Sequence, residues 1–151
     1  MLIILEGCDA TGKTTLANLL APVLNATIIH CTAETPNDMQ LFTNIAYAAA
    51  QKNIIADRFC YSQFVYQSEV NRPIFINEPE AYWVSSWDAL YSLETKLLKC
   101  DTKVIYTYAS QKDIADRMIA RGENPDSING ILDGYTELWK KTLIKPIFFK
   151  T

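Results

Sequence analysis

The stretch Leu2-Ile3-Ile4-Leu5-Glu6-Gly7-Cys8-Asp9-Ala10-Thr11-Gly12-Lys13-Thr14-Thr15 decides the fold of this 151-residue chain. It begins as a short apolar run typical of a buried strand and continues, over residues 13–24, as a helical pattern. Between the two lies a full match to G-x-x-x-x-G-K-[ST]. Glycines in such a loop let the backbone curl, so that successive N–H groups and the helix N-terminus face a polyphosphate. The stretch therefore predicts a nucleotide-phosphate site between a strand and a helix.

The side chains of this loop indicate ATP and Mg²⁺ as the bound groups. Lys13 is expected to reach the β- and γ-phosphates, and the Thr14 hydroxyl is expected to bind Mg²⁺. The alternative is a chance glycine turn, but eight positions, the flanking elements and the location all agree with the motif. The residues predicted to bind the nucleotide are Gly7, Cys8, Asp9, Ala10, Thr11, Gly12, Lys13, Thr14 and Thr15.

The rest of the chain alternates short apolar runs with longer helical segments, which is typical of an α/β fold with a parallel sheet. We expect one domain over 1–151, a three-layer fold with a five-stranded parallel sheet flanked by helices. Ligands in such folds bind outside the carboxyl ends of the strands. The expected strands are 2–5, 27–29, 53–56, 103–108 and 147–149, the expected helices are 13–24, 37–52, 60–67, 80–99, 111–121 and 127–142, and the main loops are 68–79 and 122–129.

Composition and charge exclude several classes of protein. The chain has 49% hydrophobic and 21% charged residues, which disordered and low-complexity chains do not have. Its net charge of −3 lacks the basic excess of polynucleotide-binding proteins, so no nucleic-acid partner is expected. No apolar run approaches the roughly 20 residues of a membrane span, and the four cysteines form no C-x-x-C pair. We expect a cytoplasmic protein that binds a small nucleotide and no membrane.

A second motif, Asp57-Arg58-Phe59, follows the third expected strand. A carboxylate at this point can hold a metal-bound water beside Thr14, so Thr14 and Asp57 form the predicted metal site. The neighbouring Arg58 guanidinium offers a planar, two-pronged grip for a phosphate. Taken alone, the motif is also compatible with a structural ion pair between Asp57 and Arg58 or other neighbours.

Together these residues resemble the thymidylate kinase family of P-loop nucleoside monophosphate kinases, which implies a three-layer P-loop kinase fold for the domain. The resemblance implies that Asp9 contacts the acceptor deoxyribose and that Arg58 binds its 5′-phosphate. It also implies a lid near 112–129 that carries Arg117 and Arg121. The matching residues are Glu6 to Asp9, Gly12 to Thr15, Asp57-Arg58-Phe59, Ser62, Tyr66-Gln67, Arg117 and Arg121-Gly122-Glu123. Ser62, Tyr66 and Gln67 are thereby expected against the sugar and base.

The chain departs from this family in two places. The segment between Lys13 and Asp57 is short and holds no arginine, so Phe42 and Tyr47 are its aromatic candidates for contact with the base, and Phe42 is assigned to the substrate site. Ala10 stands where some members have a P-loop arginine, so the lid must supply positive charge. The predicted catalytic residues are Lys13, Asp9, Arg58, Arg117 and Arg121.

The predicted function is transfer of the ATP γ-phosphoryl group to the 5′-phosphate of dTMP or a 5-substituted dUMP. One alternative is a deoxynucleoside kinase acting on a 5′-hydroxyl, with Asp9 or Asp57 as general base. A second is a non-catalytic P-loop nucleotide-binding module. His30, the single histidine, is assigned a structural or solvated role. A homodimer is expected through the aromatic stripe of 80–99 and the apolar face of Ile45, Ala46, Ala49 and Ala50.

Overall fold

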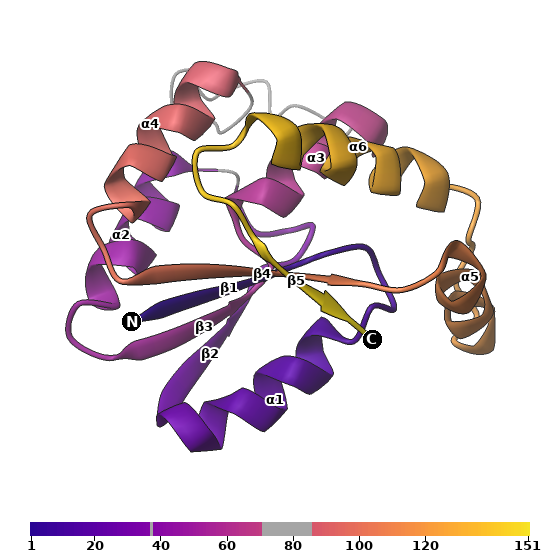
Figure 1. The fold of residues 1–151 in the computed structure, drawn as a ribbon, viewed down its shortest axis with the longest axis horizontal. Helices are drawn as coiled ribbons and strands as arrows, with labels where there is room; N and C mark the ends of the chain where they lie inside the picture. The colour runs from indigo at the N-terminus through magenta and orange to yellow at the C-terminus, as the bar shows by residue number, and fades with distance from the viewer. Residues whose placement is uncertain (37, 71–85) are drawn as a thin grey trace.

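The computed structural model describes residues 1–36, 38–70 and 86–151, with only the backbone of 67–70, and in this part of the chain it holds one parallel sheet (Figure 1). The strand order is β2-β3-β1-β4-β5, and each neighbouring pair is parallel. This confirms the expected α/β fold with a five-stranded sheet. The strands are β1 (Leu2–Glu6), β2 (Ala26–His30), β3 (Asn53–Asp57), β4 (Thr102–Tyr108) and β5 (Ile147–Lys150).

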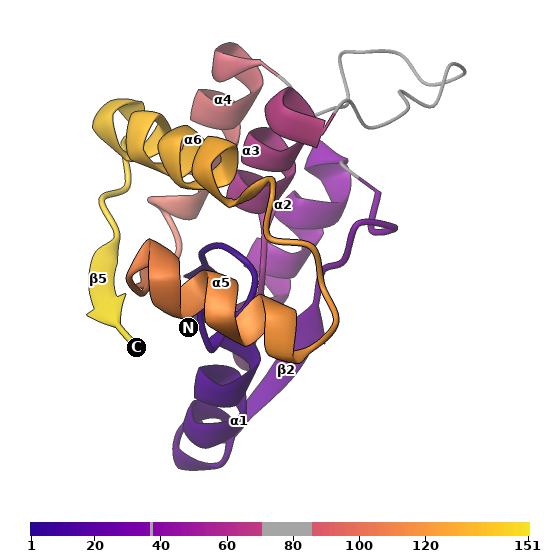
Figure 2. The ribbon, with the colours of Figure 1, turned by 90° about the vertical axis from the view of Figure 1, so that its right-hand side faces the viewer.

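The helices form the two outer layers (Figures 1 and 2). Helix α1 packs on one face of the sheet, against a small core that includes Ile3, Leu5 and Ile55. The opposite face carries the larger core, which takes residues from the other helices. These are α2 (Met39–Ala48), α3 (Cys60–Val70), α4 (Trp87–Leu97), α5 (Gln111–Ala120) and α6 (Ile128–Lys141), and α1 spans Lys13–Leu24.

The element order agrees with the sequence-based prediction, and the bounds differ by more than one residue in three helices. Helix α2 is shorter than 37–52 because Asp38 caps it, accepting a hydrogen bond of 2.8 Å from the Gln40 N–H. Helix α3 continues through 68–70, where a loop was expected, and 71–79 lie outside the described residues. Helix α4 begins after its N-cap Ser86, and the predicted helical residues 80–85 also lie outside the described part.

The strand order determines where the functional residues meet. β1 lies in the middle of the sheet, with every residue buried, between β3 and β4. In the register of these strands, Leu5 lies opposite Asp57 of β3 and Glu6 lies opposite Tyr106 of β4. The loop that follows β1 and the turn that begins with Arg58 after β3 therefore leave the sheet side by side.

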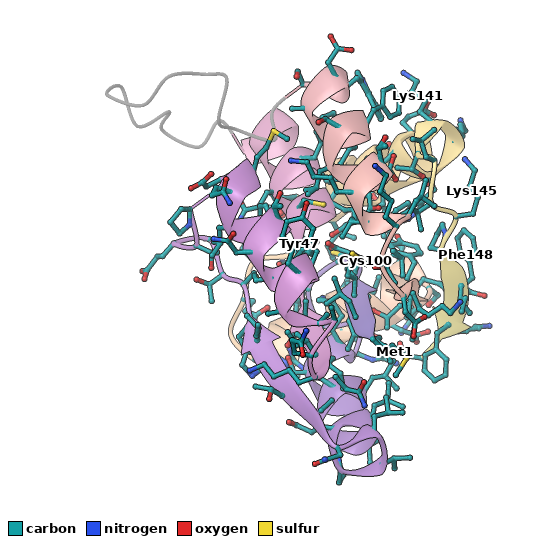
Figure 3. The ribbon with its side chains drawn as sticks, turned by 90° about the vertical axis from the view of Figure 1, so that its left-hand side faces the viewer. Met1, Tyr47, Cys100, Lys141, Lys145 and Phe148 are labelled. Carbon is teal, nitrogen blue, oxygen red and sulfur yellow. The ribbon has the colours of Figure 1, made fainter. Side chains whose placement is uncertain are left out.

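Three of the four α2-region residues predicted for the dimer face are used inside the protomer, whereas the fourth, Ala50, is exposed. Ile45, Ala46 and Ala49 are buried, because α2 packs beside α4 on the same side of the sheet (Figure 3). The outward side of α2 instead presents Tyr47, which is 57% exposed. On α4, Trp87 packs against Phe64 of α3, with ring centroids 4.7 Å apart. The apolar pattern of these helices thus reflects intramolecular packing.

No helix in the described part of the chain combines the length and the apolar character that a membrane crossing needs.

Candidate active site

A cavity of about 390 Å³ opens at the carboxyl ends of β1, β2 and β3. One wall is the loop after β1 and the start of α1, with Asp9, Ala10, Gly12, Lys13, Thr14 and Thr15. The other walls come from residues 30–33 after β2, from Asp57 and Arg58 after β3, and from Arg121 after α5. Most of the residues predicted from the two motifs therefore line one cavity, whereas Cys8 and Thr11 are buried within the loop.

Positive backbone φ angles shape the phosphate-binding loop, as its glycines predicted. Gly7 has φ 142° and Gly12 has φ 80°, and Ala10 adopts φ 59°. A Cβ atom on Gly7 would lie 2.3 Å from the carbonyl oxygen of Thr107 on β4, so only glycine fits there. The Thr107 hydroxyl shares a 2.8 Å hydrogen bond with the hydroxyl of Thr11. Thr107 of β4 thus anchors the phosphate-binding loop, a role that the sequence did not reveal.

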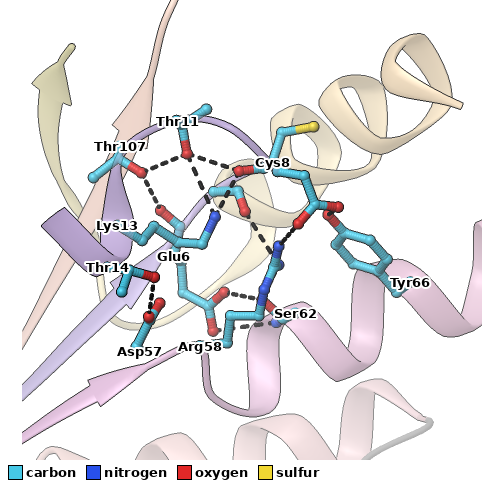
Figure 4. Close-up of polar contacts among 12 residues, drawn as sticks. Glu6, Cys8, Thr11, Lys13, Thr14, Asp57, Arg58, Ser62, Tyr66 and Thr107 are labelled. Atoms are coloured by element: carbon cyan, nitrogen blue, oxygen red, sulfur yellow. Dashed lines mark hydrogen bonds and ion pairs between the residues drawn. The ribbon is translucent and has the colours of Figure 1, made fainter. Parts of the chain in front are cut away.

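Lys13 is the most buried cation of the cavity wall, with 6% of its surface exposed. Its ammonium group donates a 2.6 Å hydrogen bond to the Cys8 carbonyl, which also accepts one of 2.7 Å from the Thr11 hydroxyl (Figure 4). Burial and the neighbouring Arg58 charge lower the pKa of Lys13 from 10.5 to about 8. An anion in the cavity would stabilise the charged form of this side chain.

Thr14 and Asp57 form a pair suited to Mg²⁺. The Thr14 hydroxyl donates a 2.6 Å hydrogen bond to the Asp57 carboxylate. Mg²⁺ keeps several waters and binds few protein oxygens beside substrate phosphates, and these two side chains fit that pattern. Among the described residues, no group of three or more histidine, cysteine, aspartate or glutamate side chains could hold a metal. His30, which was predicted to have a structural or solvated role, also lines the cavity, and its Nδ1 lies 3.1 Å from the same carboxylate oxygen of Asp57.

Arg58 is held in place by the loop after β1 and by α3. Its guanidinium pairs with Asp9 and donates to the Gly7 carbonyl at 3.3 Å and to the Ser62 hydroxyl at 3.2 Å. It also lies over the Tyr66 ring, 5.0 Å from the centroid, and the Tyr66 hydroxyl donates to Asp9 at 3.1 Å. The carboxylate that Arg58 pairs with is therefore Asp9, while Asp57 faces Thr14.

Glu6, the last residue of β1, is a fully buried carboxylate beneath Arg58. It accepts hydrogen bonds from the Phe59 and Ser62 N–H groups, at 2.9 and 3.2 Å, and from the Ser62 hydroxyl. The Tyr135 hydroxyl of α6 adds a fourth, at 3.0 Å. Burial raises the pKa of Glu6, and the Ser62 bond and the Arg58 charge oppose that rise. In the sequence, Glu6 ends an apolar strand and matches the family resemblance, but neither feature indicated its contacts with α3 and α6.

The two lid arginines have different surroundings. Arg121, at the C-terminal end of α5, lines the cavity. Arg117 instead donates to the Ala10 carbonyl at 3.2 Å and to the Thr151 hydroxyl at 3.1 Å. In this arrangement Arg121 faces the cavity and Arg117 holds the backbone of the phosphate-binding loop.

The residues predicted to contact the acceptor sugar and base are placed at different depths. Phe42 has no exposed surface and packs against the Phe59 ring, with centroids 4.7 Å apart, so it belongs to the core and does not line the cavity. Tyr66 lies beside Asp9, and Ser62 is buried beneath Arg58. The side chain of Gln67 lies outside the described residues.

Comparison with known proteins places the chain in a family. No protein-family model matches it. The SPbeta prophage-derived uncharacterized protein YorR of Bacillus subtilis (strain 168) is 32% identical over 144 residues, which cover 91% of this chain and 81% of YorR. The chain belongs to the YorR family. The crystal structure of YorR in complex with phosphorylated GDP superposes with a TM-score of 0.75 at 29% identity, over 99% of this chain and 85% of YorR.

More distant structures share the fold of the YorR family. Deoxyadenosine kinase from M. mycoides, solved with bound dCTP, has a TM-score of 0.60 at 21% identity and matches 100% of this chain and 89% of its own. Thymidylate kinase from Candida albicans has a TM-score of 0.58 at 19% identity, over 99% of this chain and 83% of that one. The chain therefore has the fold of P-loop nucleotide and nucleoside kinases. At these identities the likenesses show the fold and do not assign the chain to the thymidylate kinase family.

Proposed function

We propose that this protein is a nucleoside monophosphate kinase, which transfers the γ-phosphoryl group of ATP to the 5′-phosphate of a deoxynucleoside monophosphate. The proposed acceptor is dTMP or a 5-substituted dUMP, as the thymidylate kinase motifs suggest. The observation that carries the proposal is the pair of cations Lys13 and Arg58 in one cavity, one on the phosphate-binding loop and the other after β3. Two phosphate groups, one from each substrate, need two such positions.

In the proposed reaction the chain positions charge and does not form a covalent bond to the phosphoryl group. Lys13 would hold the β- and γ-phosphates of ATP, and Arg58 would hold the acceptor phosphate with its planar fork. Arg121 would approach the transferred group from the lid. Thr14 and Asp57 would hold Mg²⁺, directly or through water, and the bound cation would offset the charge that develops on the phosphates.

The carboxylates available for the alternative reaction are already engaged. A deoxynucleoside kinase needs a base for the 5′-hydroxyl, and Asp9 pairs with Arg58 while Asp57 accepts from Thr14. These contacts favour the monophosphate acceptor, for which the incoming oxygen is already ionised.

The test compares phosphorylated and unphosphorylated acceptors with ATP·Mg²⁺. We expect wild-type kcat/KM to be higher for dTMP than for thymidine. Arg58→Lys keeps the charge but removes the fork, so it should lower kcat/KM for dTMP about 10- to 100-fold, the equivalent of a charge-assisted bond of ~1.5–3 kcal/mol, and leave thymidine turnover unchanged. Lys52→Arg, at an exposed site, is the matched control. The panel should include guanine nucleotides, because the YorR crystal structure holds phosphorylated GDP.

Two results would contradict the proposal. A wild type that prefers thymidine, or an Arg58→Lys variant equally impaired on both acceptors, would favour the deoxynucleoside kinase. ATP binding without turnover of any acceptor would favour a non-catalytic nucleotide-binding module.

We also propose that the protein is cytoplasmic, as its cysteine pattern suggests, and that it forms a homodimer, as the thymidylate kinase resemblance suggests. Its interface would have to exclude Ile45, Ala46 and Ala49, since these side chains are already buried in the protomer. Light scattering at micromolar concentration measures the mass directly, and a monomer there would contradict the dimer.

A further inference from the structure

Glu6, the last residue of β1, caps the N-terminus of helix α3, although it lies outside that helix. Phe59 directly precedes α3 and Ser62 lies in its first turn, where backbone N–H groups have no partner within the helix. In a common arrangement, side chains of the helix itself satisfy these two positions. Here one carboxylate oxygen of Glu6 accepts from both N–H groups. The start of α3 is thereby tied to the end of β1.

Arg58 lies directly before this capped turn and adopts a backbone conformation that a side chain disfavours. Its φ is 71°, in the left-handed region. Its own N–H donates to the Leu5 carbonyl of β1 at 3.0 Å. Bonds to Leu5 on one side and to Glu6 on the other therefore hold the chain at residues 58–62 in this strained turn.

The second carboxylate oxygen of Glu6 connects to the guanidinium. It accepts the Ser62 hydroxyl hydrogen, and the oxygen of that hydroxyl accepts from Arg58 at 3.2 Å. Tyr135 donates to the same oxygen of Glu6, so the carboxylate accepts four hydrogen bonds in all. Because all four donors are on the chain, the carboxylate can keep one orientation in a site that water does not reach.

We propose that Glu6 is a positioning residue, which fixes the Arg58 guanidinium against the phosphate-binding loop through Ser62 and the first turn of α3. This role rests on the proposed function, in which Arg58 holds the acceptor phosphate. Since Glu6 directly precedes Gly7, the same residue links the loop that holds the donor to the side chain that holds the acceptor. The distance between the two phosphate sites is then set by a single buried carboxylate.

Glu6→Gln tests the role with little change in volume. One amide oxygen can still accept from Phe59 and Ser62, but the amide nitrogen cannot accept from the Ser62 and Tyr135 hydroxyls, and the negative charge beside Arg58 is lost. We expect kcat/KM for dTMP to fall roughly 10- to 100-fold, as it does for buried partners that orient metal ligands. The dissociation constant of ATP should stay unchanged. Ser62→Ala, which removes only the hydroxyl link, should lower dTMP turnover in the same direction.

Glu94→Gln is the matched control for simple destabilisation. Glu94 is also fully buried, and it accepts from the Tyr61 hydroxyl and from the Leu143 and Ile144 N–H groups at 2.9 to 3.1 Å. Glu94 does not line the cavity. We expect Glu94→Gln to lower the melting temperature about as much as Glu6→Gln does, with the KM for dTMP unchanged.

A double-mutant cycle with Arg58→Lys separates positioning from a structural effect. If Glu6 acts through Arg58, Glu6→Gln should cost little further kcat/KM in the Arg58→Lys background. Fully additive losses, or a loss of ATP affinity equal to that for dTMP, would overturn the role of Glu6 and leave the kinase proposal in place. A wild type without activity on phosphorylated acceptors would overturn the proposed function, and the role of Glu6 with it.

Discussion

Lys13→Met should make the protein more stable and inactive at the same time. The pKa of Lys13 falls from 10.5 to about 8, chiefly through burial. At ~1.4 kcal/mol for each tenfold change, a charged Lys13 costs the folded state about 3 kcal/mol at neutral pH. Methionine has a similar length and no charge. The substitution removes the Lys13 hydrogen bond to the Cys8 carbonyl, but this buried acceptor stays paired because it keeps the hydrogen bond from the Thr11 hydroxyl.

The expected gain at pH 7 is roughly 6–12 °C in melting temperature for a domain of this size. Phosphoryl transfer should fall by ~10²–10³ or more, as for the loss of one preorganised catalytic contact. Lys52→Met, at an exposed site, should change stability by less than ~0.5 kcal/mol.

The pH dependence gives the stricter check. Between pH 8 and 10.5 the unfolded chain holds the Lys13 proton and the folded protein does not, so wild-type stability rises with pH in this window. The Lys13→Met variant lacks this rise. The difference in unfolding free energy between the Lys13→Met variant and the wild type should therefore shrink from about 3 kcal/mol at pH 7 to under about 1 kcal/mol at pH 10. A variant that melts below the wild type at pH 7, or a gap that is constant with pH, would refute the reasoning.

Four further substitutions have defined outcomes. Arg121→Ala should lower kcat with ATP affinity retained, because Arg121 faces the cavity. Arg117→Ala should weaken ATP binding, because the Arg117 guanidinium holds the Ala10 carbonyl of the phosphate-binding loop. Steady-state kinetics with ATP titrations would show the opposite pattern if the two roles are reversed. Gly7→Ala should destabilise the fold by more than ~3 kcal/mol, since its Cβ would collide with the backbone of β4; denaturant unfolding with a normal midpoint would contradict this. Asp57→Asn should raise the Mg²⁺ concentration needed for half-maximal activity, and an unchanged Mg²⁺ titration would remove Asp57 from the metal site.

The sequence predicted local features well because each follows from neighbouring residues. The loop at 7–14 carries its own glycines, lysine and hydroxyl, so its strand, its turn and its helix were recognisable together. Apolar periodicity likewise located every strand and helix core. It could not distinguish an intramolecular face from an interface, which is why Ile45 and Ala46 were assigned to a dimer and lie against the core.

The remaining errors concern contacts between residues far apart in the chain. Phe42 was assigned to the acceptor site by its type and region, but α2 turns the ring toward Phe59. The cluster around Glu6 joins β1, α3 and α6, and Tyr135 lies 129 positions away in the chain. Without the strand order and helix packing, a tyrosine on an apolar helix face can be recognised only as a packing residue.

The central position of β1 has a consequence for native-state hydrogen exchange. The amides of Leu2–Glu6 are covered by a strand on each side and a helical layer on each face, so they should exchange only when the whole domain unfolds. Helix α5 has only Ile114 and Met118 buried, and its amides should exchange through local openings of much lower free energy. The base of the phosphate-binding loop thus belongs to the last unit to unfold, while the helix that carries Arg121 can open and close many times without disturbing it.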